Sequence, residues 1–375
     1  MTDQVEHATR SHAIYAPSMT RWSKENGCTA APFAIAQMPE EEEGEAAIAG
    51  TEAHEEIERC FGKMNGEFVT PATMPINPVD PDHPAAYGIA LMISYIRQLP
   101  PGRLWIERHV ELTKDIHGTP DVRHWEETTG VLTVPDFKNG FIGVDADTEQ
   151  LKIYAAASVY TDNLPLKWAR LVIVQPNDFR PVPRVKQHVV SAAELYEFAQ
   201  RIAKIPAGPK VFRAGQHCVY CPVFGKCEAT QDALTQLAIW MQHSPEDLLP
   251  HQVAKVLAIR KPVEHWFAGV EKVHTKKALT GKMPDDMKLV TSTKHRAWKD
   301  VEAARRLVLD RLGPDALDVP TPAQAIDRGI PEDVVNAMAP RPDGAPVLAF
   351  ANDKRPDWKQ KSVQQMFAGV LPQKG

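Results

Sequence analysis

The chain has 375 residues, of which 43% are hydrophobic and 24% charged, and its formal net charge is −5. This length can bury one large core or two smaller ones, and the composition is ordinary for a globular protein. No apolar run approaches the length of a membrane span, and the N-terminus lacks the apolar core of a signal peptide. We therefore expect a cytoplasmic protein that does not contact a membrane.

Charge is unevenly distributed along the chain. From residue 251 onward, 21 Lys and Arg residues outnumber 15 Asp and Glu residues, so this part carries +6 and the preceding part −11. A basic region beside an acidic one is compatible with contacts to phosphate groups, although solvated helical faces explain single lysines equally well. We expect one domain over residues 1–243 and a helical, basic region over residues 244–375 that binds DNA or a partner.

The N-terminal part is predicted to be helical. The segment that begins Ser18-Met-Thr-Arg-Trp22 reads as a short, N-capped helix that ends near Gly27. Residues 40–45 form an acidic loop or the first turn of the next helix, where negative charge suits the helix dipole. Longer helices are expected over Ala46–Phe61 and Ala85–Gln98, with a proline-rich linker from Pro71 to Pro84 between them.

Apolar and β-branched runs then predict a sheet. Strands are expected over Leu104–Leu112, Asp121–Trp125, Val131–Lys138 and, after a helix over Asp147–Tyr160, over Trp168–Val174. The remainder reads as helical, with helices over Ala192–Ile205 and Glu228–Gln242 and breaks at Pro314–Pro322 and Pro340–Pro346. This order of elements predicts an α/β fold with a mainly helical C-terminal region.

Chemistry-bearing residues gather between Gly118 and Tyr154. Asp136 and Lys138 are two apart on a predicted strand and point to one face, whereas Phe137 points to the other. Asp121 begins the neighbouring strand, and Gln150 and Tyr154 share a face of the following helix. Two carboxylates, a lysine and two polar groups can thus converge at one end of the sheet, which is the outline of a metal-dependent hydrolytic site.

The Asp-x-Lys pattern alone is weak evidence for such a site. The sequence contains it three times, whereas about one chance occurrence is expected at average composition. The copies at Asp286 and Asp357 lack both a preceding apolar run and an upstream Gly-x-x-Asp turn, so we interpret them as solvated surface. Only the copy at Asp136 has a second acid, Asp121, at the head of a neighbouring strand.

Four of the five cysteines are candidates for a metal site. Cys218, Cys221 and Cys227 form a Cys-x2-Cys-x5-Cys cluster, which in a cytosolic protein indicates metal binding and not a disulfide. Cys28 is the candidate fourth ligand and His217 its rival, while Cys60 reads as a small buried helix residue. Four thiolates suit either zinc or an iron–sulfur cluster.

The motifs taken in order resemble those of RecB-type nucleases in the PD-(D/E)XK superfamily. The resemblance rests on Gly50-x-x-x-His54, Glu107, Gly118-x-x-Asp121, Asp136-x-Lys138 and Gln150-x-x-x-Tyr154. One cysteine before this core and three after it resemble the iron–sulfur subgroup, which includes the AddAB helicase-nucleases and the CRISPR-associated RecB-like exonucleases. The chain is most similar to a phage and prophage family of unknown function, a similarity that includes Gln175-Pro176 and the tail from Asp353 to Pro356.

The resemblance implies a restriction-endonuclease-like core with a mixed central sheet flanked by helices. It implies a deoxyribonuclease, and we expect a phage-type exonuclease of recombination, replication or repair in a bacterial host cell. Its partners would be DNA and a phage recombinase or single-strand-binding protein. A [4Fe–4S] cluster would be held by Cys28, Cys218, Cys221 and Cys227, with structural zinc as the alternative.

The resemblance also implies roles for single residues. His54, Asp121, Asp136 and the carbonyl of Phe137 would hold Mg²⁺ or Mn²⁺, and the imidazole favours Mn²⁺. Lys138 would orient the attacking water and stabilise charge on the phosphate. Glu107, Gln150 and Tyr154 would lie around these residues or against the DNA backbone.

Two other classes of function compete with a nuclease. A catalytically silent DNA-binding or scaffolding protein on the same fold would be favoured by a missing lysine or acid, and none is missing. A zinc-stapled RNA-processing factor would predict a cluster of aromatic stacking platforms, which the 7% of aromatic residues do not form in the sequence.

Overall fold

The computed structural model of the protein describes residues 13–39, 44–282, 284–285 and 331–333. The chain divides into two compact units, residues 1–318 and 319–375, and every element below belongs to the first. In the described part of the chain, no helix combines the length and apolarity needed to cross a membrane. The predicted breaks at Pro314–Pro322 and Pro340–Pro346, and the two discounted Asp-x-Lys copies, lie outside the described residues.

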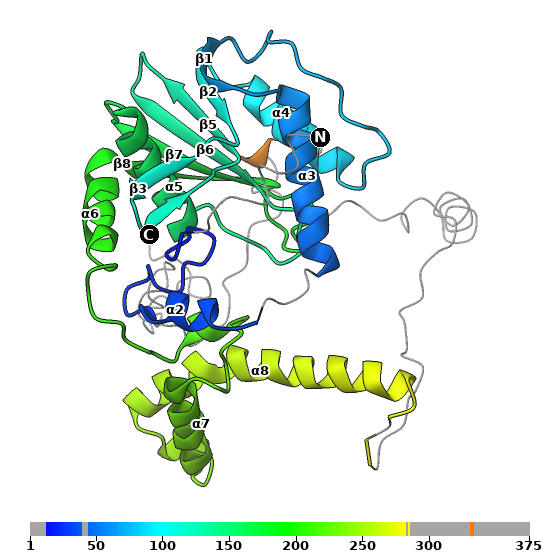
Figure 1. The fold of residues 1–375 in the computed structure, drawn as a ribbon, viewed down its shortest axis with the longest axis vertical. Coiled ribbons are helices and arrows are strands. Elements are labelled where there is room, and N and C mark those ends of the chain that lie inside the picture. Colours follow the sequence, from blue (N-terminus) through cyan, green and yellow to red (C-terminus); the bar gives the residue numbers. More distant parts are fainter. Residues whose placement is uncertain (1–12, 40–43, 283, 286–330, 334–375) are drawn as a thin grey trace, which may run out of the picture. The chain divides into compact units, whose positions relative to one another are not determined.

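A six-stranded mixed sheet forms the centre of the first unit (Figure 1). Its strands lie in the order β1-β2-β5-β6-β7-β8, and β6 and β7 are parallel while every other pair is antiparallel. The predicted α/β class and the mixed sheet are therefore confirmed. The bounds of the strands are Asn65–Val69, Gly102–Ile106, Val122–Glu126, Val131–Phe137, Trp168–Val174 and Val185–Ser191.

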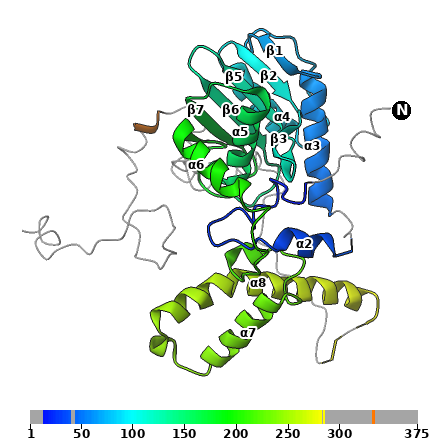
Figure 2. The same cartoon turned by 60° about the vertical axis from the view of Figure 1, so that its left-hand side comes forward.

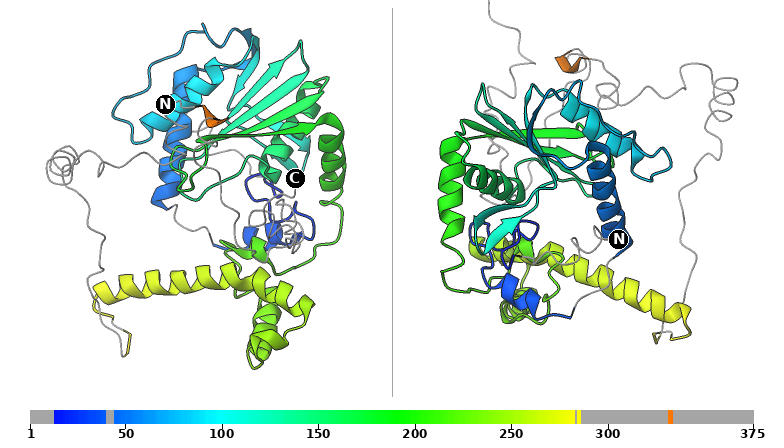
Figure 3. Two further views of the ribbon diagram at one scale, coloured as in Figure 1. Left: turned by 180° about the vertical axis from the view of Figure 1, so that it is seen from behind. Right: turned by 45° about the horizontal axis from the view of Figure 1, so that its top comes forward.

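Side-chain alternation along β7 shows how the sheet acquires two buried faces. Val172 and Val174 pack in one apolar cluster with helices α3 (Glu45–Phe61) and α4 (Ala86–Arg97). Leu171 and Ile173 pack on the opposite face in a cluster with α5 (Glu149–Asp162) and α6 (Ala192–Ala203) (Figure 2). Helices thus cover both faces, which Figure 3 shows in two further views, and central strands buried in this way read as continuous apolar runs.

The predicted single strand from Leu104 to Leu112 is wrong. Strand β2 ends at Ile106, and Glu107 adopts a left-handed backbone conformation with φ 49°. This conformation turns the chain out of the sheet, because a strand requires φ near −120° or below. The chain then forms a separate hairpin of β3 (Val110–Thr113) and β4 (Ile116–Gly118).

The predicted short helix from Ser18 to about Gly27 is also wrong, because this segment forms turns and bends. Trp22 is buried, its ring lies edge-on to Tyr15, and its Nε1 donates to the carbonyl of Ala16 over 3.3 Å. Packing of these rings against Ile116 outweighs the local preference for a helix. The first described helix is α2, Ala31–Ala36.

The other predicted helices are present, with ends that differ from the prediction by at most two residues. Strands β1, β4 and β8 were not predicted, because their sequences contain many polar residues. The expected domain boundary at residue 243 stays a prediction. Helix α7 (Glu228–Trp240) lies before this boundary. The short helix η2 (Pro245–Asp247) and helix α8 (Pro250–Leu279) follow it.

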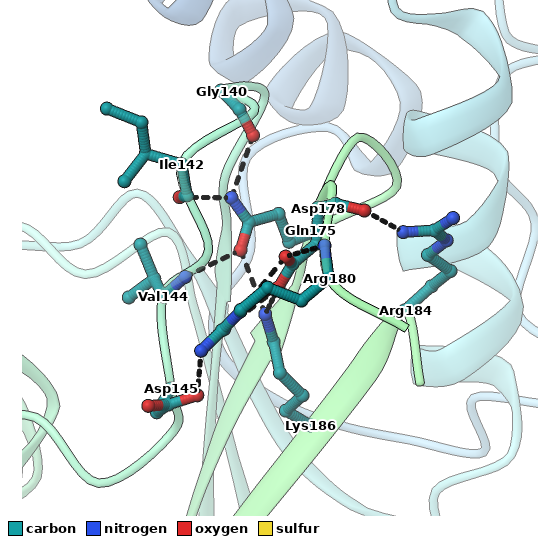
Figure 4. A network of polar contacts seen from close by, with 9 residues as sticks. All are labelled: Gly140, Ile142, Val144, Asp145, Gln175, Asp178, Arg180, Arg184 and Lys186. Carbon is teal, nitrogen blue, oxygen red and sulfur yellow. Dashed lines mark hydrogen bonds and ion pairs between the residues drawn. The ribbon is translucent and has the colours of Figure 1, made fainter. Parts of the chain in front are cut away.

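Gln175 joins the loop after β6 to strands β7 and β8 (Figure 4). The side chain is fully buried. Its Nε2 donates to the carbonyls of Gly140 and Ile142 over 2.7 and 2.8 Å, and its Oε1 accepts from the Val144 N–H and from Lys186 Nζ over 2.9 and 2.8 Å. Four hydrogen bonds satisfy the amide, so this one side chain fixes the path of the loop.

Asp178 is the charged centre of the same network. Arg180 Nη2 and Lys186 Nζ lie 2.9 and 2.6 Å from its Oδ2, and Arg184 donates to its carbonyl. Arg180 also pairs with the exposed Asp145 over 2.9 Å. The hydrogen bonds from Arg180, followed by those from Lys186, hold the pKa of Asp178 well below its ordinary value despite burial.

We predict that Asp178→Asn lowers the free energy of unfolding by about 3 kcal/mol at neutral pH, since it removes the buried carboxylate that pairs with two partly buried cations, Arg180 and Lys186. A carboxyl whose pKa is depressed in the folded state stabilises the fold above its unfolded pKa and loses this effect as pH falls. Urea unfolding should therefore show a constant difference from pH 5 to 8 that shrinks below about pH 3.9.

The control is Asp145→Asn, which removes the exposed partner of Arg180 and should cost at most about 1 kcal/mol. Equal effects of the two substitutions would contradict the central role of Asp178.

Candidate metal centre

A cavity of about 700 Å³ lies at the carboxyl end of β6. It brings together all seven residues that the sequence places in a catalytic role, and they come from five different elements or their ends. They are His54, Glu107, Asp121, Asp136, Lys138, Gln150 and Tyr154. Residues separated by up to 100 positions in the sequence thus line one space.

His54, Glu107 and Asp121 form the tightest group in this cavity. His54 Nδ1 lies 3.3 Å from Asp121 Oδ2 and 3.7 Å from Glu107 Oε1. Among the residues that the structure describes, these three supply the one trio of candidate ligand atoms that lie within 4.8 Å of one another. Carboxylate oxygens with an imidazole nitrogen suit a divalent cation such as Mn²⁺.

Backbone geometry aims the two carboxylates. In the antiparallel pair of β2 and β5, Ile106 lies opposite Val122, and the Glu107 N–H donates to the carbonyl of Asp121 over 2.9 Å. Glu107 therefore faces Asp121 at the end of both strands. The left-handed conformation of Glu107 is rare for a residue with a side chain, and such strain is common at functional sites.

Asp136 and Lys138 form an ion pair beside this trio. Lys138 Nζ lies 2.8 Å from Asp136 Oδ2, a buried oxygen that makes no hydrogen bond of good geometry, and 3.4 Å from Gln150 Oε1. Burial raises the pKa of Asp136 to about 6, the charge of Lys138 opposes this rise, and the charge of Asp121 adds to it. A cation bound near Asp136 would relieve this destabilisation of its charged form.

Phe137 connects the two halves of the site. Its N–H donates to Asp121 Oδ2 over 2.7 Å, and its ring lies edge-on to His54 at a centroid distance of 6.1 Å. The hydrogen bond fixes the rotamer of Asp121 and leaves Oδ1 for another partner. The role of the Phe137 carbonyl as a metal ligand stays a prediction.

Tyr154 closes the floor of the cavity. It is buried on α5, and burial, followed by the charges of Asp136 and Asp121, raises the pKa of its hydroxyl, which therefore stays protonated at neutral pH. A Cβ on Gly118 would lie 3.1 Å from both Tyr154 Cε1 and the ring of Pro17. Glycine at this position lets the chain before Asp121 pass close to the tyrosine.

Two histidines of the same cavity were missed from the sequence. His109 and His117 lie on either side of the β3–β4 hairpin, with ring centroids 5.1 Å apart. The prediction of a single strand over Leu104–Leu112 separates these two histidines along the chain. The hairpin of β3 and β4 instead brings them side by side. Recognising a turn at Lys114-Asp115 would have revealed the pair.

The four cysteines proposed as ligands line one small pocket away from the cavity. Cys28, Cys218, Cys221 and Cys227 meet there, and His217 lies with them. Burial raises the pKa of Cys218 to about 11, and negative charge on Cys221, Cys28 and Cys227 would add to this rise. The structure therefore brings Cys28 to the other three.

Hydrogen bonds hold the segment around Cys28 against the loop that carries Cys218, Cys221 and Cys227, here named the cysteine loop. Arg21 Nη2 donates to the carbonyls of Val219 and Tyr220 over 3.3 and 2.9 Å, and Arg213 Nη1 donates to that of Gly27 over 3.3 Å. Cys60 is buried elsewhere, on α3, where burial raises the pKa of its thiol. This agrees with its interpretation as a small buried helix residue.

If the cavity holds a divalent cation, Glu107→Gln and Asp121→Asn should each weaken Mn²⁺ binding at least 10-fold, because each removes an anionic oxygen from the trio. Titration calorimetry of the full chain measures this without any substrate. Glu127→Gln, an exposed acid just after β5, is the matched control and should leave the affinity unchanged. Unchanged affinity in both cavity variants would exclude this trio as the metal ligands.

The sequence was compared with protein families, curated proteins and solved structures. No curated protein matches it. Among solved structures, the chain is similar to one titled "Crystal structure of SSO0001", with 12% sequence identity and a TM-score of 0.24, over 34% of this chain and 60% of that one. Residues 91–356, which include Glu107, Asp121, Asp136, Lys138 and the cysteine loop, match the model of the family described as "Protein of unknown function (DUF2800)", and the chain therefore belongs to the DUF2800 family.

Proposed function

We propose that this protein is a divalent-metal-dependent deoxyribonuclease with a PD-(D/E)XK core. The observation that carries the proposal is the convergence of Asp121, Asp136 and Lys138 with Gln150 and Tyr154 in one cavity at the end of a central strand. The order and spacing of these residues resemble RecB-type nucleases, and the parallel pairing of β6 with β7 fits such a core. We further propose an exonuclease that serves recombination, replication or repair of phage DNA.

The residues present fit Mg²⁺ or Mn²⁺. Asp121, Asp136, Glu107 and His54 would hold the ion, which when bound would polarise the scissile phosphate and acidify a water molecule. Asp136 provides a buried oxygen without a well-aligned hydrogen bond, and Asp121 is oriented by the N–H of Phe137. The chain thus supplies the negative charge and the fixed rotamers that a cation site requires.

Lys138 would act on the phosphate and the attacking water. Burial favours its neutral form, but the charges of Asp136 and Asp121 outweigh burial and raise its pKa, so the ammonium group is charged at neutral pH. Gln150 holds Nζ from the other side over 3.4 Å. A fixed positive charge at this place would stabilise negative charge that develops on the phosphate.

Tyr154 and the histidines would complete the site. The protonated hydroxyl of Tyr154 can donate a hydrogen bond to a phosphate oxygen or to a water molecule. His109 and His117 line the same cavity, where their ring N–H groups could donate hydrogen bonds to the DNA backbone.

We also propose that Cys28, Cys218, Cys221 and Cys227 hold a structural [4Fe–4S] cluster. The four cysteines line one small pocket, and one cysteine before the core with three after it resembles the iron–sulfur subgroup of RecB-type nucleases. Such a cluster would tie together segments 190 positions apart in the sequence.

Lys138→Ala should abolish cleavage of linear DNA in Mn²⁺, with at least a 100-fold loss of rate, because the charge that stabilises the phosphate is removed. Incubation with end-labelled linear and closed circular DNA measures both cleavage and the need for an end. Lys167→Ala is the control, since this exposed lysine lies at the opposite end of the parallel strands.

Metal binding by Lys138→Ala should equal that of the wild type, which separates loss of chemistry from loss of the ion. A clean Lys138→Ala preparation with undiminished cleavage would sink the assignment, and wild-type protein that binds DNA without cutting it would favour a silent DNA-binding protein.

Anaerobically purified protein should be brown and contain about four irons per chain, as a cysteine-bound [4Fe–4S] cluster requires. Replacing any of the four pocket cysteines should bleach it and lower stability, by up to roughly 5 kcal/mol if the cluster acts as a cross-link of this loop length. Cys60→Ser is the matched control and should remain brown. Colourless protein with one zinc would overturn the iron assignment, and full metal content in Cys28→Ala would exclude Cys28 as a ligand.

A further inference from the structure

Three large apolar side chains are exposed together on two neighbouring loops. Phe141 and Ile142, in the loop after β6, are 70% and 65% exposed, and Phe179, in the loop after β7, is 73% exposed. The Phe179 N–H donates to the carbonyl of Phe141 over 3.3 Å, which joins the loops. We name these three residues the apolar tip. Apolar groups that gather at the surface mark a site of interaction.

The backbone under the apolar tip is firmly held (Figure 4). Gln175 binds the carbonyls of Gly140 and Ile142, on either side of Phe141. Asn177 Nδ2 donates to the carbonyl of Asn139 over 2.9 Å. A Cβ on Gly143 would overlap the guanidinium of Arg180, so glycine there allows the arginine to lie across the loop. The exposed side chains are thus presented on a fixed backbone.

The loop that carries Phe141 and Ile142 begins and ends at the metal cavity. It follows Lys138 and leads into α5, where Gln150 stands 3.4 Å from Lys138 Nζ. Phe141 is three residues from Lys138, so their Cα atoms are at most about 11 Å apart. That distance corresponds to about three base steps of 3.4 Å in B-DNA.

Charge around the apolar tip favours an anionic partner. Arg180, Arg184 and Lys186 outnumber the acids Asp145 and Asp178 in the supporting network, and Arg180 keeps 28% of its side chain exposed. Exposed aromatic and aliphatic side chains next to cations match nucleic acid, whose bases have apolar faces and whose backbone is anionic.

We infer that the apolar tip stacks on the bases at the end of a DNA substrate and separates the terminal pair beside the cavity. Phe and Ile are residues that proteins insert between base steps for this purpose. The inference rests on the proposed function, because it names how that site engages its substrate. It assigns Phe141, Ile142 and Phe179 to substrate positioning and not to chemistry.

The test uses the full chain in EDTA, where a metal-dependent nuclease leaves its probe intact. The probe is a blunt duplex oligonucleotide with 2-aminopurine in its terminal pair, whose fluorescence reports stacking. Wild-type protein should change this fluorescence, and the double variant Phe141→Ala, Phe179→Ala should lose the change and bind roughly 10-fold more weakly, as loss of base–aromatic stacking does. Tyr160→Ala, which removes an exposed ring from α5, should behave as wild type.

Thermal melting should show that all variants are folded, and Ile142→Ser provides the same readouts with a smaller change. Unaltered fluorescence and affinity in the folded double variant would overturn the inference. Failure of the proposed function is distinguishable, since wild-type protein that cuts no DNA in Mn²⁺ refutes the nuclease while the fluorescence measurement still decides the apolar tip.

Discussion

A central strand buried on both faces can hold charges only near its end, and β6 is organised by this constraint. Leu132 and Val134 pack under α5 and Phe137 packs under α4, so the apolar positions are all occupied. Asp136 is the second-last residue of β6, points to the same face as Leu132 and Val134, and is itself buried. An isolated carboxylate there would be costly, and the ion pair with Lys138 over 2.8 Å makes it tolerable.

Neighbouring elements supply polar groups around the pair of Asp136 and Lys138. Gln150 binds Lys138 from α5, and Asp121 receives the N–H of Phe137 from β5. Asp121 in turn lies beside His54, which comes from the helix on the other face. Each group restrains the next, yet burial, opposed by the charge of Lys138 and aided by that of Asp121, still raises the pKa of Asp136 to about 6. The charged form of Asp136 is therefore destabilised in the folded chain, and a bound cation would stabilise it. Such local destabilisation is common at functional sites.

Two further sets of contacts fix loops of the chain. At the cavity, Gln175 and Asp178 hold the loop that follows Lys138, so the chain leaves the site along a defined path. Away from the cavity, Arg21 and Arg213 hold the segment of Cys28 against the loop that carries Cys218, Cys221 and Cys227. Both arrangements use side chains to satisfy backbone carbonyls outside helices and strands, where the backbone cannot do so itself.

The sequence by itself determined the elements whose signal is local. Apolar and β-branched runs located β6 and β7, an apolar stripe located α4, composition located α3, and strand alternation placed Asp136 and Lys138 on one face, facing Gln150 and Tyr154. Spacing also singled out the three clustered cysteines. These features depend on neighbours within a few residues, and so they are readable without a structure.

Tertiary structure decided what depends on distant contacts. The left-handed turn at Glu107 divides an apolar run that reads as one strand, and it places His109 and His117 on a separate hairpin. Trp22 is drawn into a core with Ile116, which overrides the local preference for a helix. The meeting of Cys28 with a loop 190 positions away likewise follows only from the folded chain, because no local energy links segments so far apart until packing brings them together.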